Sequence, residues 1–303
     1  MTAPTPTVSV VVPTRNRPHQ VVPCAQSILQ NADALEVIFI DQSDDMKTAD
    51  ALAALQDPRL RCVRSELRGV TNGRNLGIDL SQGEIVAFTD DDCRVRTDWV
   101  ASLARIFATD AQATVVCGRV TVPEGLEKEG FVTGFEPRVR EWQDRYPPPD
   151  SDWGITANLA LRRSVIGRVG PFDPLLGAGG ILRSGGEPDF LFRVLRSGLK
   201  VVNASEVEVE HLGVRAHGDD SARLLKNYAA GTAAAFLKYV RLGDLDGAAI
   251  YLKHLAGCGH LILTNLAHLH RPVGFGYTLA FLSGSVASLR YRVDKKARVY
   301  TTS

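Results

Sequence analysis

The stretch GEIVAFTDDDCR, residues 83–94, decides which fold the sequence predicts. Residues 85–88 are apolar throughout, as in a strand that is buried on both faces, and such strands are typical of parallel sheets covered by helices. Three consecutive carboxylates follow this strand, at the end where open parallel sheets bind their ligands. We therefore expect a binding site directly after residue 88.

Asp90, Asp91 and Asp92 repel one another unless water screens them or a divalent cation neutralises them. Their oxygen ligands suit Mg2+ or Mn2+ rather than zinc. In an extended segment side chains alternate between faces, so Asp90 and Asp92 would point one way and Asp91 the other. A solvated acidic turn is the alternative, but the position after a buried strand favours a metal site.

The composition narrows the class of protein only slightly. The 303 residues are 45% apolar and 23% charged, with a formal net charge of +1, which gives no reason to expect nucleic acid as a partner. The five cysteines are scattered and lack CxxC spacing, which argues against a disulfide framework or a zinc site and fits a reducing cytoplasm. The N-terminus has no secretory signal pattern, so we expect a cytoplasmic protein.

Strand-like segments alternate with helix-like segments in the first part of the chain. The strand-like segments are residues 8–12, 35–40, 60–63 and 85–88. This alternation predicts an α/β fold with a mostly parallel sheet, helices on both faces and a binding crevice along the carboxyl edge of the strands. Asp41, Arg74 and the three aspartates should share that edge, although Asp41 could equally cap a helix.

The loop SELRGVTNGRN, residues 65–75, combines glycines with arginines. Glycine lets the backbone approach a ligand closely, and guanidinium groups pair with phosphate oxygens, so the loop suits an anion. A glycine-rich turn with solvated arginines would have the same composition.

Four segments together carry a family resemblance: VSVVVPTRNRP (8–18), VIFIDQSDD (37–45), RGVTNGRNLGI (68–78) and GEIVAFTDDDCRVRTDWV (83–100). In this order and at this spacing they resemble the nucleotide-sugar-binding half of a family 2 glycosyltransferase of the GT-A fold. The resemblance covers roughly residues 7–213. It implies an inverting enzyme that transfers a sugar from a nucleoside diphosphate sugar, most simply a UDP-sugar, to an acceptor hydroxyl in polysaccharide, glycolipid or other envelope glycan synthesis.

The resemblance also implies the donor and metal contacts. Asp41 would accept hydrogen bonds from the nucleotide base, and Asp90 and Asp92 would be the DxD pair, one near the ribose and one on the metal. The segment EVEVEHLG, residues 206–213, alternates as an exposed or edge strand would and has His211 near its end. By the resemblance His211 would hold Mg2+ or Mn2+ with Asp92, and His217 is a weaker alternative. The residues expected to bind the nucleotide sugar are Pro13, Thr14, Arg15, Arg17, Asp41, Arg74, Asp90 and Asp91.

A helix that begins near EPDFLFRVLRSG, residues 187–198, carries the expected general base. The family usually has Glu-Asp here, with an arginine six residues after the aspartate; counting back from Arg193 reaches Glu187, and Gly186 replaces the preceding acid. Glu187 is therefore the expected catalytic base and Asp189 the reserve. A structural role for Glu187 at the positive end of the helix dipole can coexist with catalysis.

The acceptor half is less clearly marked. Residues 123–151, with three consecutive prolines and no clear periodicity, predict a variable loop on the acceptor side. The next segment resembles the family's strand beneath the acceptor, so we expect Trp153 and Asn158 to contact the acceptor, although Trp153 could equally pack in the core.

The domains we expect are a GT-A domain over residues 1–215, divided near residue 119 into donor and acceptor halves, and a helical region over residues 216–303. Residues 273–289 are apolar, and Arg290, Arg292, Lys295, Lys296 and Arg298 follow them. Such a helix beside a basic cluster fits peripheral contact with the inner face of the cytoplasmic membrane, or a homodimer or core-capping helix.

Three rival functions share parts of this pattern. A sugar-nucleotide nucleotidyltransferase typically has a glycine-rich first loop, whereas this chain has PTRNRP after its first strand. A phosphatase with an aspartyl nucleophile needs its acidic pair on the first strand, but here the acids follow the fourth. A non-catalytic binding module with the same fold is the third rival.

Overall fold

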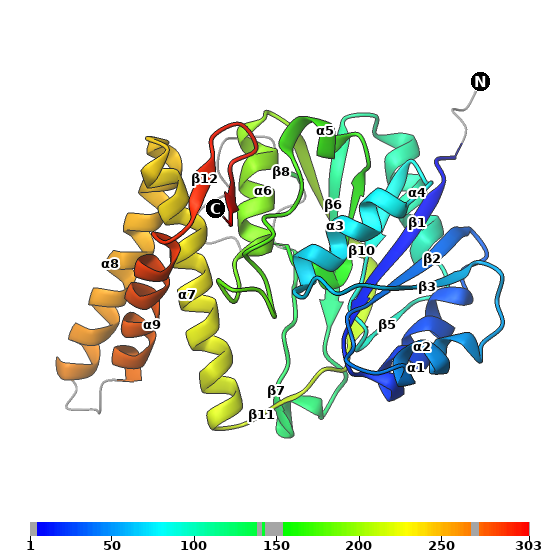
Figure 1. Ribbon diagram of the computed structural model, residues 1–303, viewed down its shortest axis with the longest axis horizontal. Coiled ribbons are helices and arrows are strands. Elements are labelled where there is room, and N and C mark those ends of the chain that lie inside the picture. Colours follow the sequence, from blue (N-terminus) through cyan, green and yellow to red (C-terminus); the bar gives the residue numbers. More distant parts are fainter. Residues whose placement is uncertain (1–4, 138–140, 143–153, 268–272, 303) are drawn as a thin grey trace.

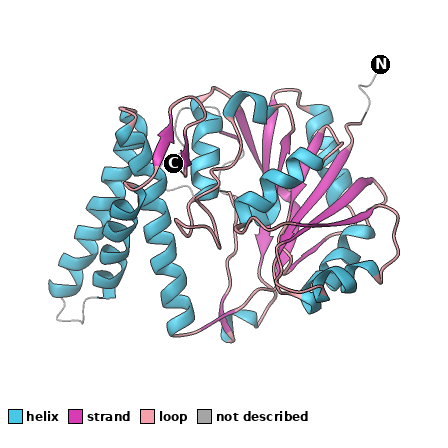
Figure 2. Cartoon of the chain, in the orientation of Figure 1, coloured by secondary structure: helices cyan, strands magenta, loops and turns pink. Residues whose placement is uncertain are grey.

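The computed structural model describes residues 5–137, 141–142, 154–267 and 273–302, so the expected acceptor residue Trp153 lies outside the described residues. The chain forms a central sheet flanked by helices, with a three-helix layer at one side (Figures 1 and 2). The strands are β1 (Val8–Thr14), β2 (Ala34–Asp41), β3 (Leu60–Arg64), β4 (Ile85–Phe88), β5 (Cys93–Val95), β6 (Ala113–Thr121), β7 (Gly130–Phe131), β8 (Glu141–Trp142), β9 (Leu159–Arg162), β10 (Lys200–His211), β11 (Arg215–Ala216), β12 (Arg292–Asp294) and β13 (Val299–Thr301). The α-helices are α1 (Pro18–Leu29), α2 (Lys47–Ala53), α3 (Val70–Leu80), α4 (Trp99–Thr109), α5 (Val165–Val169), α6 (Gly186–Arg196), α7 (Asp219–Arg241), α8 (Leu245–Ala267) and α9 (Val273–Ser288), and two 3-10 turns are η1 (Leu126–Lys128) and η2 (Thr156–Asn158).

The predicted α/β sheet flanked by helices is confirmed. Strands β3, β2, β1 and β4 lie side by side in this order and are parallel, as their βα alternation requires. Beyond β4, the strand β9 runs antiparallel to both β4 and β6, and β10 returns parallel to β6. The carboxyl ends of β1 and β4 therefore meet at one edge of the sheet, where Thr14 and the three aspartates are found.

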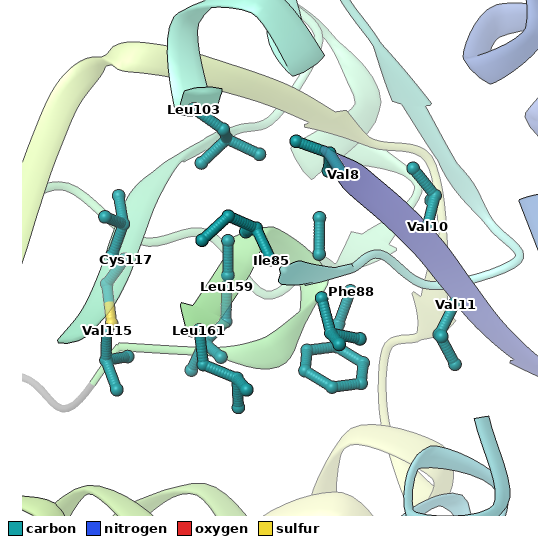
Figure 3. Close-up of a cluster of buried hydrophobic side chains, with 14 of the residues drawn as sticks. Val8, Val10, Val11, Ile85, Phe88, Leu103, Val115, Cys117, Leu159 and Leu161 are labelled. Carbon is teal, nitrogen blue, oxygen red and sulfur yellow. The ribbon is translucent and has the colours of Figure 1, made fainter. Parts of the chain in front are cut away.

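The sheet core consists of β-branched and aliphatic side chains that are buried on both faces. Every residue of β1 and β4 is buried, and Figure 3 shows their side chains together with those of the central strands and α4. On one face α3 approaches β1 closely at Gly77, where a Cβ atom would lie 2.2 Å from Cγ1 of Val11. The absence of a side chain at this position sets the distance between helix and sheet.

Three local expectations need correction. The segment predicted as an exposed or edge strand is not an edge strand, because it belongs to the twelve-residue β10, which pairs with β6 on one side and with β5 on the other. Its acidic residues alternate because one face is solvated, not because the strand lies at an edge. The variable loop contains short strands, since β7 pairs with β11 and β8 with β10.

The third correction concerns the aspartates. The strand β4 ends at Phe88, and Asp91 and Asp92 lie in a turn, so the alternation of an extended segment does not apply to them. Both carboxylates point toward the guanidinium group of Arg17, whose Nη1 lies 2.6 Å from Asp91 Oδ1 and 2.9 Å from Asp92 Oδ2.

The C-terminal helices pack against α6 in a hydrophobic cluster that is separate from the core of the sheet. Phe192 of α6 packs against Phe236 and Tyr239 of α7, with ring centroids 5.7 and 4.6 Å apart. The side chain of Tyr300, in the hairpin β12–β13, is buried in the same cluster. The domain boundary near residue 215 stays a prediction, but residues from both sides of it pack together in this second cluster.

A buried ion network crosses this contact. Nζ of Lys238, on α7, lies 2.7 Å from Asp173 Oδ2 and 2.6 Å from Asp189 Oδ1, and all three side chains are fully buried. Arg193 pairs with the second oxygen of Asp189 at 3.1 Å. Asp173 also accepts the backbone N–H of Tyr300 at 2.8 Å, so the network holds α6, α7 and the C-terminal hairpin together.

We expect Lys238→Met to lower the free energy of unfolding by about 3–5 kcal/mol, because it leaves two carboxylates buried without their shared cation. Chemical denaturation measures this change. Lys226→Met, at an exposed position of the same helix, should change stability by less than about 0.5 kcal/mol. Equal effects of the two substitutions would show that the buried pairs do not stabilise the contact.

Candidate active site

A cleft of about 880 Å³ lies at the carboxyl edge of the sheet. It brings together residues from the ends of β1 and β4, from α3, from the start of α6 and from the end of β10. The expected site residues that line it are Pro13, Thr14, Arg15, Arg17, Arg74, Asp90, Asp91, Asp92, Glu187 and His211. Residues more than a hundred positions apart in the sequence thus converge on one concave surface.

Arg74 connects the two acidic sides of the cleft. Its guanidinium group is almost fully buried, with Nη1 3.1 Å from Glu187 Oε1 and Nη2 3.3 Å from Asp90 Oδ1. Its Nε is buried without a hydrogen-bond partner within the described residues. The helix α3 therefore presents one cation to both carboxylates.

Glu187 sits in the first turn of α6, where a carboxylate is favoured by the helix dipole. Oγ1 of Thr156 donates to its Oε1 at 2.6 Å. Burial raises the pKa of Glu187, but the positive charge of Arg74 and the hydrogen bond from Thr156 outweigh this effect and lower the pKa below its ordinary value. Glu187 is therefore ionised at neutral pH and faces the cleft.

The three aspartates differ in their environment. Burial raises the pKa of Asp91 to about 6, partly offset by Arg17 and by the hydroxyl of Thr14, which donates to Oδ2 at 2.6 Å. Burial also raises the pKa of Asp90, against the opposing charge of Arg74. About a third of the Asp90 side chain is accessible, and this surface faces the cleft.

Asp92 and His211 form the part of the cleft that could hold a metal. Asp92 Oδ1 lies 3.2 Å from His211 Nε2, and the other ring nitrogen, Nδ1, lies 2.7 Å from the carbonyl oxygen of Thr133, which fixes the ring orientation. Burial raises the pKa of Asp92, but the hydrogen bond and charge of His211, together with Arg17, outweigh it and lower the pKa to about 2. A carboxylate oxygen from the turn before β5 and an imidazole nitrogen at the end of β10 suit Mn2+ or Mg2+.

Two further residues bear on the fit of a metal. A Cβ atom at Gly213 would lie 2.3 Å from Asp92 Oδ2 and 3.0 Å from His211 Nε2, so the space beside this pair depends on glycine. The Sγ atom of Cys93 is also within reach of the pair, but burial raises its pKa far above the ordinary value and keeps it a neutral thiol. The donor set is therefore one oxygen and one nitrogen, which fits the expected cation.

Three expected residues lie away from the cleft. The carboxylate of Asp41 is fully buried and pairs with Nη1 of Arg64 at 3.0 Å and with the backbone N–H of Ser43 at 2.9 Å, so its contact with a nucleotide base stays a prediction. The amide of Asn158 is buried between Trp99, 2.9 Å away, and the carbonyl groups of two strands. The Asn158 amide is therefore occupied by hydrogen bonds inside the protein, and its contact with an acceptor stays a prediction.

Asp189 is the third of these residues. It belongs to the buried network with Lys238 and Arg193 and does not line the cleft. Opposing charges from these two cations lower its pKa, although burial acts in the other direction. His217, the weaker alternative to His211, is exposed and does not line the cleft either.

Sequence reasoning missed one wall of the cleft. The helix α7 contributes Leu224, Asn227, Tyr228 and Thr232, and the glycine-rich turn before α6 contributes Arg183 and Ser184. Tyr228 lies with its hydroxyl 3.3 Å from Oγ1 of Thr133, beside the imidazole of His211. No sequence motif marks these residues, because they reach the cleft only when α7 packs against the sheet domain.

Residues 9–170, more than half of the chain, match the model of the glycosyl transferase family 2, so the protein belongs to this family. The chain is 28% identical over 189 residues to glycosyltransferase AglE of Haloferax volcanii, covering 59% of this chain and 60% of that protein. It is 27% identical over 171 residues to the glucosyl-dolichyl phosphate glucuronosyltransferase of the same organism, covering 51% of each. The chain thus spans between half and two thirds of the length of these relatives.

The fold is that of the GT-A glycosyltransferases. The structure of the mannosyltransferase PcManGT from Pyrobaculum calidifontis, in complex with GDP-Man and Mn2+, superposes with a TM-score of 0.62 at 18% identity. The match covers 95% of this chain and 88% of that protein, including the helices after the sheet domain. At this identity the likeness establishes the fold, and the site chemistry has to be argued from the residues.

We expect Thr156→Val to raise the pKa of Glu187, because the substitution removes a hydrogen bond that favours the charged form. A pH titration of the carboxyl carbon-13 resonance, assigned with Glu187→Gln, measures the shift. In the wild type the Glu187 carboxylate should stay ionised at pH values below the ordinary pKa of a glutamate. In the variant it should become protonated at a higher pH than in the wild type. Thr109→Val, whose hydroxyl bonds only to backbone carbonyls of α4, is the matched control and should not move this resonance.

Proposed function

We propose that the protein is an inverting glycosyltransferase that transfers a sugar from a nucleoside diphosphate sugar, a UDP-sugar in the first instance, to an acceptor hydroxyl. The observation that carries this proposal is the pairing of Glu187 on one wall of the cleft with the three aspartates on the other, across Arg74. Two acidic groups with different tasks, separated by a cation, suit a displacement in which one side holds the leaving group and the other activates the nucleophile.

The donor would occupy the side lined by β1 and β4. Arg17 and Arg74 supply guanidinium groups that can pair with phosphate oxygens, and Thr14 holds Asp91 in place. Asp92 and His211 would hold Mg2+ or Mn2+, which neutralises the negative charge on the departing diphosphate when it is bound. Pro13 and Arg15 line the same side, where the nucleoside would lie.

Glu187 would act as the general base. As the acceptor oxygen forms its bond to the anomeric carbon, the hydroxyl proton passes to Glu187, and the bond from that carbon to the diphosphate oxygen breaks with its electron pair leaving on the diphosphate. Attack from the face opposite the leaving group inverts the anomeric configuration. Asp189 is a poor alternative, since both its oxygens are occupied by buried partners.

The acceptor class is a glycan or a lipid-linked saccharide. One relative is named for glucosyl-dolichyl phosphate, a lipid-linked sugar, which supports a lipid-linked acceptor. The five cysteines are free, in agreement with a cytoplasmic location. Incubation with UDP- and GDP-sugars, Mn2+ and an extract of envelope lipids tests the activity, and donor-dependent release of the nucleoside diphosphate with a mass shift in one acceptor is the expected result. No release with any donor would leave a non-catalytic binding module as the function.

Asp92→Ala should abolish metal-dependent binding of the donor nucleotide, because it removes one of the two expected ligands. Gly213→Ala should weaken this binding at least about tenfold, since its methyl group would displace the Asp92 carboxylate. Calorimetry with UDP or GDP, with and without Mn2+, measures both effects. Gly167→Ala, at a position with open space around it, is the control. An unchanged nucleotide affinity of the Asp92 variant would contradict the proposed metal site.

Glu187→Gln should leave donor binding within a few-fold of wild type and lower kcat by about 10²–10⁴, because the amide cannot accept the proton. Single-turnover transfer and nucleotide calorimetry separate the two effects. Asp189→Asn, compared at a temperature where both variants are folded, should retain transfer. An active Glu187 variant beside an inactive, folded Asp189 variant would move the base to Asp189.

A further inference from the structure

The helix α9 exposes a solvent face that carries no charge within its described residues. Large apolar side chains recur every three or four positions along this face and are 44–61% exposed. They are Phe275, Leu279, Leu282, Val286 and Leu289, the last directly after the helix end. Over residues 274–288, where burial is described, the remaining exposed position of the helix is Ser283. A helix that is apolar on its inner and outer faces is normally covered on both.

The inner face of α9 is fixed by close packing, so the helix cannot turn its apolar face inward. A Cβ atom at Gly284 would lie 2.1 Å from the carbonyl oxygen of Ala230, which shows how closely α9 approaches α7. Phe281 packs against Tyr251 of α8 with ring centroids 5.3 Å apart, and the Tyr251 hydroxyl lies 2.9 Å from Oγ of Ser285. The five apolar side chains are therefore held outward by the fold.

The neighbouring helix α8 has a similar solvent face. Leu252 and Leu263 are 59% and 67% exposed, and Lys253 and His260 are exposed on the same helix. We refer to these four residues together with the five apolar residues of α9 as the α8–α9 face. Figure 1 shows α8 and α9 on the side of the molecule that is remote from the sheet.

The charge of this region has one sign. Between Asp246 and Asp294 the sequence contains no aspartate or glutamate, while Lys253, Arg290 and Arg292 are exposed cations there. The two acids that precede this segment, Asp244 and Asp246, pair with Arg196. Within the α8–α9 face Lys253 carries a fixed positive charge and no residue carries a carboxylate, and Arg290 directly follows Leu289 at its end.

We propose that the α8–α9 face docks onto an anionic phospholipid membrane, with α9 lying along the surface and its five apolar side chains inserted among the acyl chains. Apolar insertion combined with cations beside acidic head groups is the chemistry by which helices bind membrane surfaces. The helix does not span the bilayer: sixteen residues rise only about 24 Å, less than the roughly 30 Å of the hydrocarbon core. Within the described residues, no helix has the length and hydropathy that a membrane span needs.

A second copy of this chain is a less suitable partner. Two identical α8–α9 faces would bring cations together with no carboxylates between them, and like charges across an interface oppose association. Phospholipid head groups supply the opposite charge, and acyl chains cover the apolar side chains. The charge of the surface therefore favours lipid over self-association.

Docking in this way would hold the cleft near the membrane. One side of α7 lines the cleft with Leu224 and Tyr228, while Ala230, about two residues further along, packs against α9. The helix α7 therefore lies between the cleft and the layer formed by α8 and α9.

Vesicle sedimentation of the full chain tests the proposal. The protein should bind vesicles of phosphatidylcholine mixed with phosphatidylglycerol at low salt, and bind vesicles of phosphatidylcholine alone much more weakly. Leu279→Gln combined with Val286→Gln should lower the partition coefficient at least about tenfold, since each inserted side chain contributes more than about 1 kcal/mol. Lys253→Glu combined with Arg290→Glu should weaken binding to the anionic vesicles and leave the weak binding to neutral vesicles unchanged.

The matched control replaces exposed apolar residues at the opposite side of the molecule. Leu35→Gln combined with Met46→Gln changes side chains of similar exposure on the donor half and should leave vesicle binding unchanged. A wild-type protein that stays in the supernatant with anionic vesicles would overturn the proposal. A stable dimer in light scattering would also overturn the proposal if the Leu279 and Val286 substitutions dissociated it. Such a dimer would show that a second copy of the chain covers the face. Release of nucleoside diphosphate from a soluble donor without vesicles tests the proposed function separately.

Discussion

The neutralisation of carboxylates by two arginines is the constraint on which the cleft depends. Arg74 lies between Asp90 and Glu187, and Arg17 lies between Asp91 and Asp92. Carboxylates this close together in a poorly solvated cleft would otherwise become protonated or move apart. Because each arginine reaches two acids, the end of β4 is tied to the start of α6 and to the turn after β1. The electrostatic balance of the site therefore also fixes its shape.

The same principle operates behind the cleft, where Lys238 is shared by Asp173 and Asp189. This buried network joins α6, which carries Glu187, to α7 and to the C-terminal hairpin. A buried pair of this kind adds little net stability compared with an apolar packing, but breaking it is costly, and it specifies one arrangement of the helices. The orientation of α6, and with it the position of Glu187 in the cleft, is thus coupled to the C-terminal helices.

The helix α7 connects the C-terminal region to the cleft. It contributes one wall of the cleft and supports the layer formed by α8 and α9, whose solvent face is apolar and cationic. If the α8–α9 face docks on a membrane as proposed, α7 connects the docked layer to the cleft. The helix α7 is thus the element that contacts both the cleft and the α8–α9 layer.

The sequence by itself determined the parallel strands of the sheet, because runs such as residues 8–12 and 85–88 are apolar on both faces and can be stable only between helix layers. It also determined that Asp90, Asp91, Asp92, Glu187 and His211 are candidates for one site, since strand ends and a family pattern mark them. Only the tertiary structure decided that Asp41, Asn158 and Asp189 lie outside the cleft and that α7 lines it. Their positions follow from long-range packing and ion pairs, such as those of Arg64 and Lys238, and no local pattern of residues encodes which partner a buried polar side chain will meet.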